Sequence, residues 1–285
     1  MTVLARTREE LASALADRKP GPLVLVPTMG ALHAGHMALL AAARAVPSAY
    51  VVTSIFVNPL QFGPGEDLDR YPRTLDTDLA TCAAAGVDLV FAPSAAHMYP
   101  GGRPAVTVDP GPMGKLLEGE FRPGFFGGVL TVVLKLFSVV RPDIAVFGEK
   151  DAQQLAMIRQ MVTDFDLGVR IEPVPTVRDQ DGLALSSRNQ YLSDADRAIA
   201  LEIPRALRMG AAAAGGGPAD VLAAAQAVLD RSPKLDVDYL ALVDPATFAP
   251  AVTGPAVLAV AARAGATRLI DNALVDLGGP VAARH

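Results

Sequence analysis

Two histidines stand three residues apart in the segment VPTMGALHAGHMALL, residues 26–40, and they are half of the four histidines in the chain. The segment predicts a short strand, a turn that carries Gly30, and a helix that begins between His33 and Gly35. Such a junction presents unpaired backbone N–H groups and the positive end of the helix to an anion. Because residues i and i+3 share a helix face, His33 and His36 can point at one ligand. We therefore expect this turn to stabilise an oxyanion whose charge grows during a reaction.

Two other interpretations of the histidine pair stay open on this motif alone. One is a metal site, although no cysteine cluster or third histidine lies nearby in the sequence. The other is a structural pair with no ligand at all. The motif by itself therefore does not decide between an anion, a metal ion and a structural role.

Two further polar stretches favour the anion. FGEKDAQQL places Lys150 directly after a predicted strand, and LALSSRNQYL places two serines and Arg188 in a predicted turn. A lysine at a strand end can neutralise phosphate charge, while hydroxyls and a guanidinium supply directed donors. Taken singly, the first stretch is typical of a solvated charge cluster and the second of an ordinary turn. Together with the histidines, they predict a site for a triphosphate.

Short apolar strands alternate with helical patterns through the first part of the chain, which predicts an α/β fold with a Rossmann-like, doubly wound parallel sheet. Ligands of such sheets bind beyond the carboxyl ends of the strands. The predicted strands cover residues 23–27, 49–59, 87–93 and 143–148, and the predicted helices cover 35–45, 74–86, 126–140 and a segment from Asp151.

The pattern changes after residue 176, where we place the boundary between a first domain, 1–176, and a smaller α+β C-terminal domain, 177–285. An alanine-rich helix opens at SDADRAIALEIPRAL, where Ser193 and Asp196 fit a capping box. A loop at 215–218 precedes another helix. The segments VDYLALVD, AVLAVAARAG and TRLIDNALVDL then predict strands or hairpin arms.

Composition narrows the class of protein. The formal net charge is −5 and no run of Lys or Arg is present, which argues against a nucleic-acid partner. The first residues predict a charged amphipathic helix rather than a signal peptide, and the apolar run from Phe125 to Val140 contains Lys135, so neither predicts export or a membrane span. Cys82 is the only cysteine, which excludes an intramolecular disulfide and favours a reducing, cytoplasmic location.

The chain resembles the pantothenate synthetase family of the HxGH nucleotidylyltransferase superfamily. HxGH alone indicates only the superfamily, and the surrounding sequence segments are more specific to the family. They follow the order of the family's segments along most of the chain: PTMGALHAGH, FVNPLQF, DLDRYPRTLDTDL, FGEKDAQQL, PTVRDQDGLALSSRN and RLIDN.

This resemblance implies an ATP-dependent ligase that condenses pantoate with β-alanine through a pantoyl-adenylate intermediate and releases AMP and pyrophosphate. Mg²⁺ would accompany ATP, with no metal held by the chain itself, and the family favours a homodimer whose C-terminal domain closes over the ATP site. One alternative is a nucleotidyltransferase that makes a stable nucleotidyl product. Another is a nucleotide-sensing module without enzymatic activity.

The resemblance also assigns roles to individual residues. It makes His36, His33, Lys150 and Arg188 the catalytic candidates, Gln61 and Gln154 the pantoate-binding residues, and Gln61 a β-alanine-binding residue as well. Without it, both glutamines are typical of solvent-facing positions. The residues that it implies for ATP binding are Met29, Gly30, Ala31, Leu32, His33, Ala34, Gly35, His36, Gly148, Glu149, Lys150, Asp151, Val177, Leu185, Ser186, Ser187 and Arg188.

Two positions depart from the family pattern. Phe125 stands where the family commonly has histidine, so no catalytic role is carried over to it. Leu185 stands where methionine is frequent, a change that keeps an apolar contact of similar size.

Overall fold

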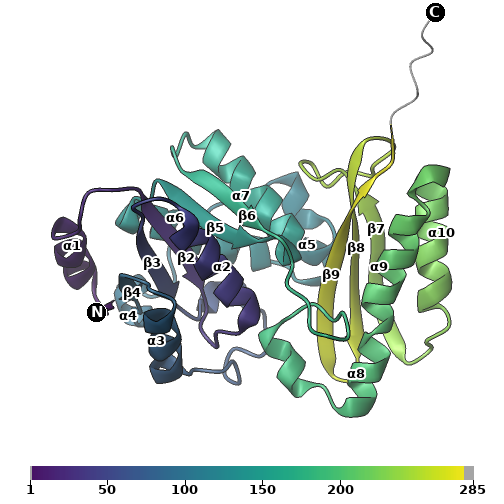
Figure 1. The fold of residues 1–285 in the computed structure, drawn as a ribbon, viewed down its shortest axis with the longest axis horizontal. Helices are drawn as coiled ribbons and strands as arrows, with labels where there is room; N and C mark the ends of the chain where they lie inside the picture. The colour runs from purple at the N-terminus through teal and green to yellow at the C-terminus, as the bar shows by residue number, and fades with distance from the viewer. Residues whose placement is uncertain (1, 279–285) are drawn as a thin grey trace, which may run out of the picture. The chain divides into compact units, whose positions relative to one another are not determined.

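The computed structural model describes residues 2–278, which form two compact units, each with its own sheet (Figure 1). The first unit contains the residues up to 149 together with 157–175, and the second contains 150–156 together with the residues from 176 onward. The division into domains 1–176 and 177–285 stays a prediction.

A six-stranded sheet, parallel throughout, forms the centre of the first unit. Its strands lie in the order β1-β4-β3-β2-β5-β6. The apolar run in β2 is buried over four consecutive residues, as expected for a central parallel strand with both faces covered. The predicted Rossmann-like sheet is therefore confirmed. The strands are β1 (Val3–Ala5), β2 (Leu23–Thr28), β3 (Tyr50–Ile55), β4 (Leu89–Phe91), β5 (Ile144–Gly148) and β6 (Arg170–Val174).

Helices pack on this sheet through side chains that alternate along the strands. Val24, Val26 and Val51 share one buried cluster with Leu40 of α2 and Cys82 of α3. The apolar run that predicts a buried helix is α6, most of whose residues are buried. The α-helices in this part of the chain are α1 (Arg8–Ala16), α2 (Ala34–Ala45), α3 (Leu75–Ala84), α4 (Ala95–Met98), α5 (Glu118–Phe121), α6 (Phe125–Val140) and α7 (Ala152–Asp164), with 3₁₀ turns η1 (Pro59–Gln61), η2 (Pro112–Lys115) and η3 (Glu149–Asp151).

The start of the chain differs from the prediction of one amphipathic helix. Residues Val3–Ala5 form the edge strand β1, which pairs in parallel with β4. Helix α1 begins only at Arg8, because the side chain of Thr7 caps it by accepting from the N–H of Glu10 at 3.2 Å. Three apolar residues show no period, so only the pairing with β4 identifies the strand.

The edge strand β6 is also absent from the sequence prediction. Arg170, Glu172 and Pro173 interrupt its apolar residues, and only Val174 is buried. Its backbone pairs with β5 along the strand, from Ile144 to Gly148. Pairing therefore overrides a side-chain pattern that is too polar to predict a strand.

The second unit contains an antiparallel sheet in the order β7-β8-β9, with helices α9 and α10 packed along it (Figure 1). The strands predicted near the C-terminus are thus confirmed, as is the smaller α+β unit. Apolar residues of the strands and helices share one buried cluster, which includes Leu207, Val221 and Leu258. The elements are η4 (Ser187–Tyr191), α8 (Asp194–Ala200), α9 (Glu202–Ala212), η5 (Ala214–Gly216), α10 (Pro218–Leu229), β7 (Leu235–Val243), β8 (Pro255–Ala264) and β9 (Thr267–Asp276).

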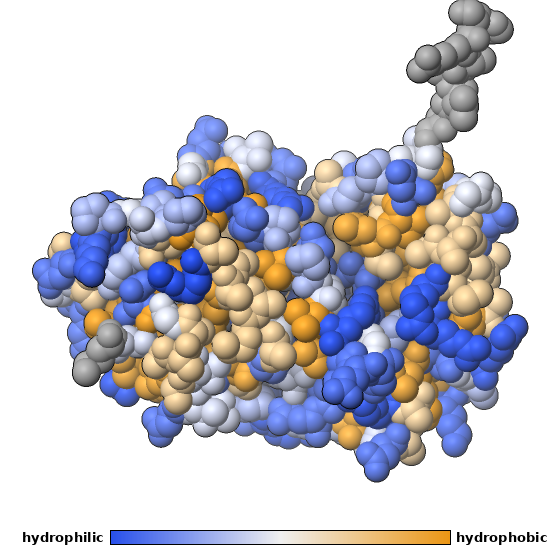
Figure 2. All heavy atoms as spheres, in the orientation of Figure 1, coloured by the Kyte–Doolittle hydropathy of each residue, from blue (hydrophilic) through white to orange (hydrophobic). Residues whose placement is uncertain are grey.

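One half of the capping box predicted at Ser193 is confirmed, because its hydroxyl accepts from the N–H of Asp196 at 3.1 Å. The Asp196 carboxylate accepts from the Ser193 hydroxyl at 2.7 Å. The alanine-rich segment forms two helices, α8 and α9, rather than one. Pro204 lies in the first turn of α9, where a missing N–H costs no helical hydrogen bond. Figure 2 shows hydrophilic side chains over the surface that α8 and α9 occupy, in agreement with the exposure of Arg205 and Arg208. Within residues 2–278, no helix is long and apolar enough to cross a membrane.

Candidate active site

The candidate residues of the first unit follow two strands that are neighbours in the sheet. β2 and β5 pair in parallel, with Val24 opposite Ile144. Their carboxyl ends therefore meet at one edge of the sheet, where β2 leads into the turn at Met29 and β5 ends at Gly148. β2 has β3 on its other side, so the strand order reverses here. In open α/β sheets this switch point is the usual place of a ligand site.

The turn after β2 is held by a buried carboxylate that the sequence did not single out. Asp78 of α3, 2% exposed, accepts hydrogen bonds from the backbone N–H of Ala31 at 3.0 Å and of Leu32 at 2.9 Å. Ala31 has a φ of 51°, an unusual backbone conformation for a residue with a side chain. Gly30 has a φ of 85°, and a Cβ there would lie 3.0 Å from the Asp78 carboxylate. The Asp78 carboxylate thus holds two consecutive backbone N–H groups of the turn.

His33 and His36 cap helix α2 reciprocally. Nδ1 of His33 accepts from the N–H of Gly35 at 3.1 Å, and Nδ1 of His36 accepts from the N–H of His33 at 3.2 Å. The two ring centroids are 4.2 Å apart, so the pair does share one face, as the spacing predicts. Both side chains are half-buried. This arrangement satisfies backbone donors in the first turn and sets the orientation of both rings.

A buried polar chain leads from Tyr99 to Gln61. The hydroxyl of Tyr99 donates to Oδ1 of Asn58 at 2.9 Å, and Nδ2 of Asn58 donates to Oε1 of Gln61 at 3.0 Å. Nε2 of Gln61 lies 3.1 Å from Sδ of Met29, so the structure brings this glutamine to the turn after β2. Burial raises the pKa of Tyr99, which keeps its hydroxyl protonated. Gln61 is buried, in contrast to the solvent-facing position that its residue type alone suggests.

Phe125, at the start of α6, packs against a guanidinium. The Arg122 Cζ lies 3.7 Å from the centroid of the Phe125 ring. Arg122 also pairs with Glu66 at 2.6 Å and donates to the carbonyl of Gln61 at 3.2 Å. Phe125 therefore contributes a stacking surface for the Arg122 guanidinium.

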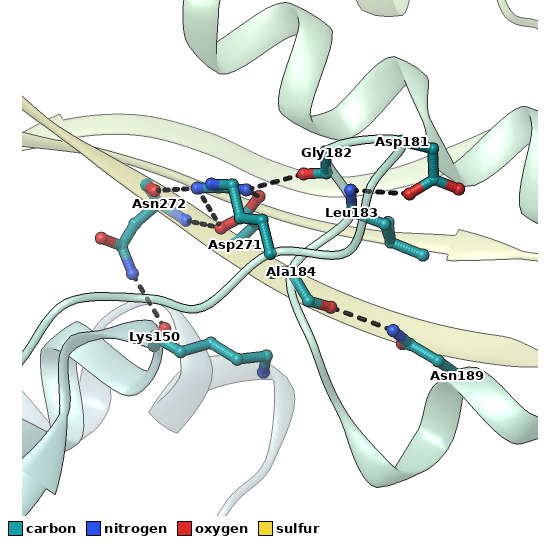
Figure 3. A network of polar contacts seen from close by, with 9 residues as sticks. Lys150, Asp181, Gly182, Leu183, Ala184, Asn189, Asp271 and Asn272 are labelled. Carbon is teal, nitrogen blue, oxygen red and sulfur yellow. Dashed lines mark hydrogen bonds and ion pairs between the residues drawn. The ribbon is translucent and has the colours of Figure 1, made fainter. Parts of the chain in front are cut away.

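The second unit carries the remaining candidates, beginning with Lys150 in η3. Its side chain is half-buried, and its backbone carbonyl accepts a hydrogen bond from the amide of Asn272 on β9 at 2.8 Å (Figure 3). Asp151 and Gln154 follow on the same stretch, where Gln154 is half-buried in the first turns of α7. None of these side chains lies fully in solvent.

Val177 and Leu185 face each other in a small hairpin. The N–H of Leu185 donates to the carbonyl of Val177 at 2.9 Å, and Gly182 turns the chain with a φ of 94°. The structure thus brings together two residues that the resemblance assigns to ATP. Ser186 follows as the cap of η4, where its Oγ accepts from the N–H of Arg188 at 3.3 Å. The predicted polar turn is therefore a capped 3₁₀ turn, with half-buried side chains from Ser186 to Arg188.

Sequence reasoning missed the residues that hold these segments in place. Asp78, Asn58 and Asn272 are polar side chains on buried positions, each bonded to a candidate residue or to its backbone. Little in the sequence marks these three residues. Each lies inside a segment that resembles the family, but no spacing or motif within that segment singles it out. Among residues 2–278, no group of three or more His, Cys, Asp or Glu side chains is arranged to hold a metal ion.

Comparison with known proteins decides the family. The profile of the Pantoate-beta-alanine ligase family matches residues 3–274. The chain belongs to the pantoate–β-alanine ligase family. This membership confirms the predicted resemblance and the predicted reaction class, an acid–amino-acid ligase, and it favours neither a transferase with a stable nucleotidyl product nor a module without activity.

Relatives within the pantoate–β-alanine ligase family are similar over nearly the whole chain. A pantothenate synthetase of Thermobifida fusca is 60% identical over 96% of this chain and 96% of its own length. A pantothenate synthetase of Mycolicibacterium smegmatis is 58% identical over 90% of this chain and 81% of its own length.

Solved structures of the family share the fold. The crystal structure of pantothenate synthetase from Thermus thermophilus has a TM-score of 0.88 and 47% identity, and covers 98% of this chain and 100% of that one. The pantoate-β-alanine ligase of Francisella tularensis, solved in complex with β,γ-ATP and β-alanine, has a TM-score of 0.80 and 33% identity, and covers 96% and 98%. The two-part α/β architecture is thus the family's own.

Proposed function

We propose that the chain activates pantoate with ATP and then transfers the pantoyl group to β-alanine, with the site residues assigned below. In the first step a pantoate carboxylate oxygen attacks the α-phosphorus of ATP, and pyrophosphate leaves. In the second step the β-alanine amine attacks the acyl carbon of pantoyl adenylate, and AMP leaves. Neither step needs a nucleophile from the protein, so the chain's task is to hold the reacting groups in line and to stabilise charge.

The reciprocal cap of His33 and His36 is the observation that carries this proposal. Nδ1 of each ring accepts a backbone hydrogen bond, so a neutral ring carries its proton on Nε2. Each imidazole is then a donor at Nε2, beside the positive end of helix α2. Donors fixed in this way suit the phosphate oxygens on which negative charge accumulates.

The proposed ATP contacts are the residues that the family resemblance implies. In the first unit, the turn after β2 and the end of β5 offer backbone N–H groups and the two imidazoles. In the second unit, Lys150 and Arg188 offer positive charge, and the hairpin of Val177 and Leu185 offers apolar surface. The full set is Met29, Gly30, Ala31, Leu32, His33, Ala34, Gly35, His36, Gly148, Glu149, Lys150, Asp151, Val177, Leu185, Ser186, Ser187 and Arg188.

Gln61 and Gln154 are the proposed pantoate contacts, and Gln61 also contacts β-alanine. Pantoate carries a carboxylate and two hydroxyls beside a gem-dimethyl group, which suits neutral amides next to apolar surface. The bond from Asn58 occupies Oε1 of Gln61 and thereby fixes which end of its amide faces Met29. A fixed amide distinguishes a hydroxyl from a carboxylate better than a rotating one.

ATP is proposed to enter with Mg²⁺ on its phosphates. Mg²⁺ commonly keeps several waters and binds through substrate phosphates rather than through a cage of protein ligands. When bound, the ion would neutralise part of the phosphate charge.

Exchange of labelled pyrophosphate into ATP tests the first step directly. We expect exchange only when pantoate is present and β-alanine is absent, because pyrophosphate must re-attack an enzyme-bound pantoyl adenylate. Pantoate-independent exchange, or none with folded protein, would contradict the proposal. Product analysis separates it from nucleotidyl transfer: with β-alanine added, free AMP is expected, whereas a nucleotidyl transferase would leave a stable nucleotidyl product.

A cytoplasmic homodimer completes the proposal. The single cysteine, buried and unpaired with another cysteine, suits a reducing compartment. The family resemblance favours a dimer, which light scattering of the purified protein tests by its mass.

A further inference from the structure

The carbonyl of Lys150 is held by a side chain from the far end of the sequence. Nδ2 of Asn272, on β9, donates to it at 2.8 Å. Asn272 is 7% exposed, so its amide is withdrawn from water and its hydrogen bond does not compete with solvent. Figure 3 shows the Lys150 side chain extending away from this amide. The contact is therefore with the backbone from which the lysine side chain starts.

The neighbouring residue of β9 ties down the hairpin that carries other candidate residues. Asp271, 4% exposed, accepts two hydrogen bonds from Arg178 at 2.6 and 3.1 Å. The same guanidinium donates to the carbonyls of Gly182 and Asn272 at 3.2 Å each (Figure 3). A bidentate pair of this kind fixes geometry as well as adding energy. Two consecutive residues of β9 thus hold η3 and the hairpin.

A hydrogen bond to a carbonyl fixes the plane of the peptide that follows the residue. For Lys150 this peptide links it to Asp151, so the bond constrains the ψ angle of Lys150, the middle residue of η3. A lysine side chain has a long, flexible stem, and its ammonium is only as well placed as the backbone that supports it. Fixing that backbone reduces the set of positions that the ammonium samples.

We propose that Asn272 is a positioning residue for Lys150. It touches no reacting atom, and it acts by holding the backbone so that the lysine ammonium meets the ATP phosphates in the adenylation step. This inference rests on the proposed role of Lys150. Misplacement of a catalytic group by about 1 Å can cost 10²-fold in rate, so we expect loss of the Asn272 amide to slow adenylation about tenfold or more.

A purely structural role for Asn272 makes a different prediction. It would lower thermal stability and slow both half-reactions alike, because the whole second unit would loosen. A positioning role through Lys150 acts on the step from which pyrophosphate leaves. Attack of β-alanine on supplied pantoyl adenylate has no pyrophosphate to expel, so it should be affected much less.

The test uses the full chain with Asn272→Leu, which keeps the branched shape and the number of side-chain heavy atoms and removes the donor. Asn272→Ala is the second variant, since it removes the donor without adding branched bulk. Asp238→Asn is the matched control. It weakens the ion pair in which Oδ2 of Asp238 lies 2.6 Å from Nε of Arg268, in the same sheet as Asn272, and the Asp238 side chain is also largely buried. Melting curves are measured for all variants.

We expect both Asn272 variants to slow adenylation about tenfold and to keep the second half-reaction within about threefold of wild type. The control should keep both rates.

A double-mutant cycle with Lys150→Ala gives the decisive comparison. If Asn272 acts through the lysine, Asn272→Leu in the Lys150→Ala background should cause less than about a twofold further loss. Multiplicative effects of the two changes would overturn the inference while leaving the role of Lys150 intact. Wild-type adenylation by an Asn272 variant, or equal loss in both half-reactions, would overturn it as well. Wild-type adenylation by Lys150→Ala would instead contradict the proposed site, which is a separate result.

Discussion

Asp78 accepts a hydrogen bond from the backbone N–H of Leu32 at 2.9 Å, through a carboxylate that is almost completely buried. Its second oxygen accepts from Ala31 at 3.0 Å, so consecutive backbone donors of the turn converge on one side chain. A buried carboxylate is stable only when its oxygens are well bonded. The turn before α2 and the carboxylate of α3 therefore depend on each other.

Replacing Asp78 by Asn should damage this turn. An amide has one acceptor oxygen, so one of the two backbone N–H groups would face an NH₂ group and stay unpaired, at a cost of about 1–3 kcal/mol in the free energy of unfolding. Because Ala31 keeps its unusual φ only while it is held, the rings of His33 and His36 should also shift. We expect a lower melting temperature and adenylation slowed about tenfold or more.

Thr74→Val is the matched control for that variant. The Thr74 hydroxyl donates to the same carboxylate at 3.2 Å, and its described hydrogen bonds include none to the backbone of the turn. Its loss leaves both backbone bonds in place. If Thr74→Val slows adenylation as much as Asp78→Asn does, the carboxylate does not act through the turn.

Two functions of His36 can be separated by substitution. His36→Ala removes the acceptor for the His33 N–H and the Nε2 donor, and adenylation should slow by about 10² to 10³, as for the loss of one preorganised donor to an oxyanion. His36→Asn keeps an acceptor close to the position of Nδ1 but has no group at Nε2. It should recover stability lost by the alanine variant without recovering the rate. Single-turnover adenylate formation and urea titration measure the two effects, and recovery of rate by asparagine would show that the cap alone matters.

Much of the fold follows from local sequence patterns. The strand at 23–27 and the buried helix near 126–140 are apolar runs next to a turn residue, and the helix at 35–45 follows the cap at His33. The strands β1 and β6 have no such pattern, since the first is too short and the second too polar. Both lie at an edge of the sheet, where pairing with a neighbour supplies the stabilisation and leaves little trace in the sequence.

The candidate site also contains residues that the sequence predicts and residues that it does not. Residues such as His33 and Lys150 stand out because imidazoles or a charge lie shortly after the end of a predicted strand. Asp78, Asn58 and Asn272 do not stand out, since their roles depend on partners that are distant in sequence. Polar residues at buried positions are identified only once the tertiary structure shows what surrounds them.

Cys82 should be chemically inert in the folded protein. Its side chain is completely buried, and burial followed by the charge of Asp78 raises the pKa of its thiol to about 11. The thiolate that reacts with iodoacetamide is therefore scarce and inaccessible at pH 8. We expect alkylation only after unfolding in urea, detected by mass spectrometry. Rapid labelling of the native protein would contradict this burial.

The same shift makes stability depend on pH in the alkaline range. The folded pKa of Cys82 lies above the ordinary thiol value of 9.0, so its contribution to stability is fully present below that pH. As pH rises towards about 11, the unfolded chain loses the proton first and is favoured. The free energy of unfolding of wild type should therefore fall more between pH 8 and pH 10.5 than that of Cys82→Ala. Parallel declines in urea titrations would exclude the thiol as the source.

Tyr99 should influence pantoate binding without touching the substrate. Its hydroxyl is one of two donors to Oδ1 of Asn58, the other being the N–H of Leu60 at 3.2 Å, and Asn58 in turn fixes the amide of Gln61. Tyr99→Phe keeps the edge contact with Phe56 but removes the hydroxyl, so the Asn58 amide becomes freer to rotate. Loss of one hydrogen bond in a buried chain is worth about 0.5–1.5 kcal/mol, which corresponds to a rise of about two- to tenfold in the KM for pantoate.

Comparing the KM for pantoate with the KM for ATP distinguishes this effect from a general loss of order in the site. Because the chain from Tyr99 ends at Gln61, the KM for ATP should stay within about twofold of wild type while the KM for pantoate rises. Tyr50→Phe is the matched control, since Tyr50 lies on β3 of the same unit and has no contact with Asn58 or Gln61 among its described hydrogen bonds. It should leave both KM values unchanged. If Tyr99→Phe raises both KM values equally, or neither, the hydroxyl does not orient the glutamine, and the buried chain serves only to satisfy polar groups between η1 and α4.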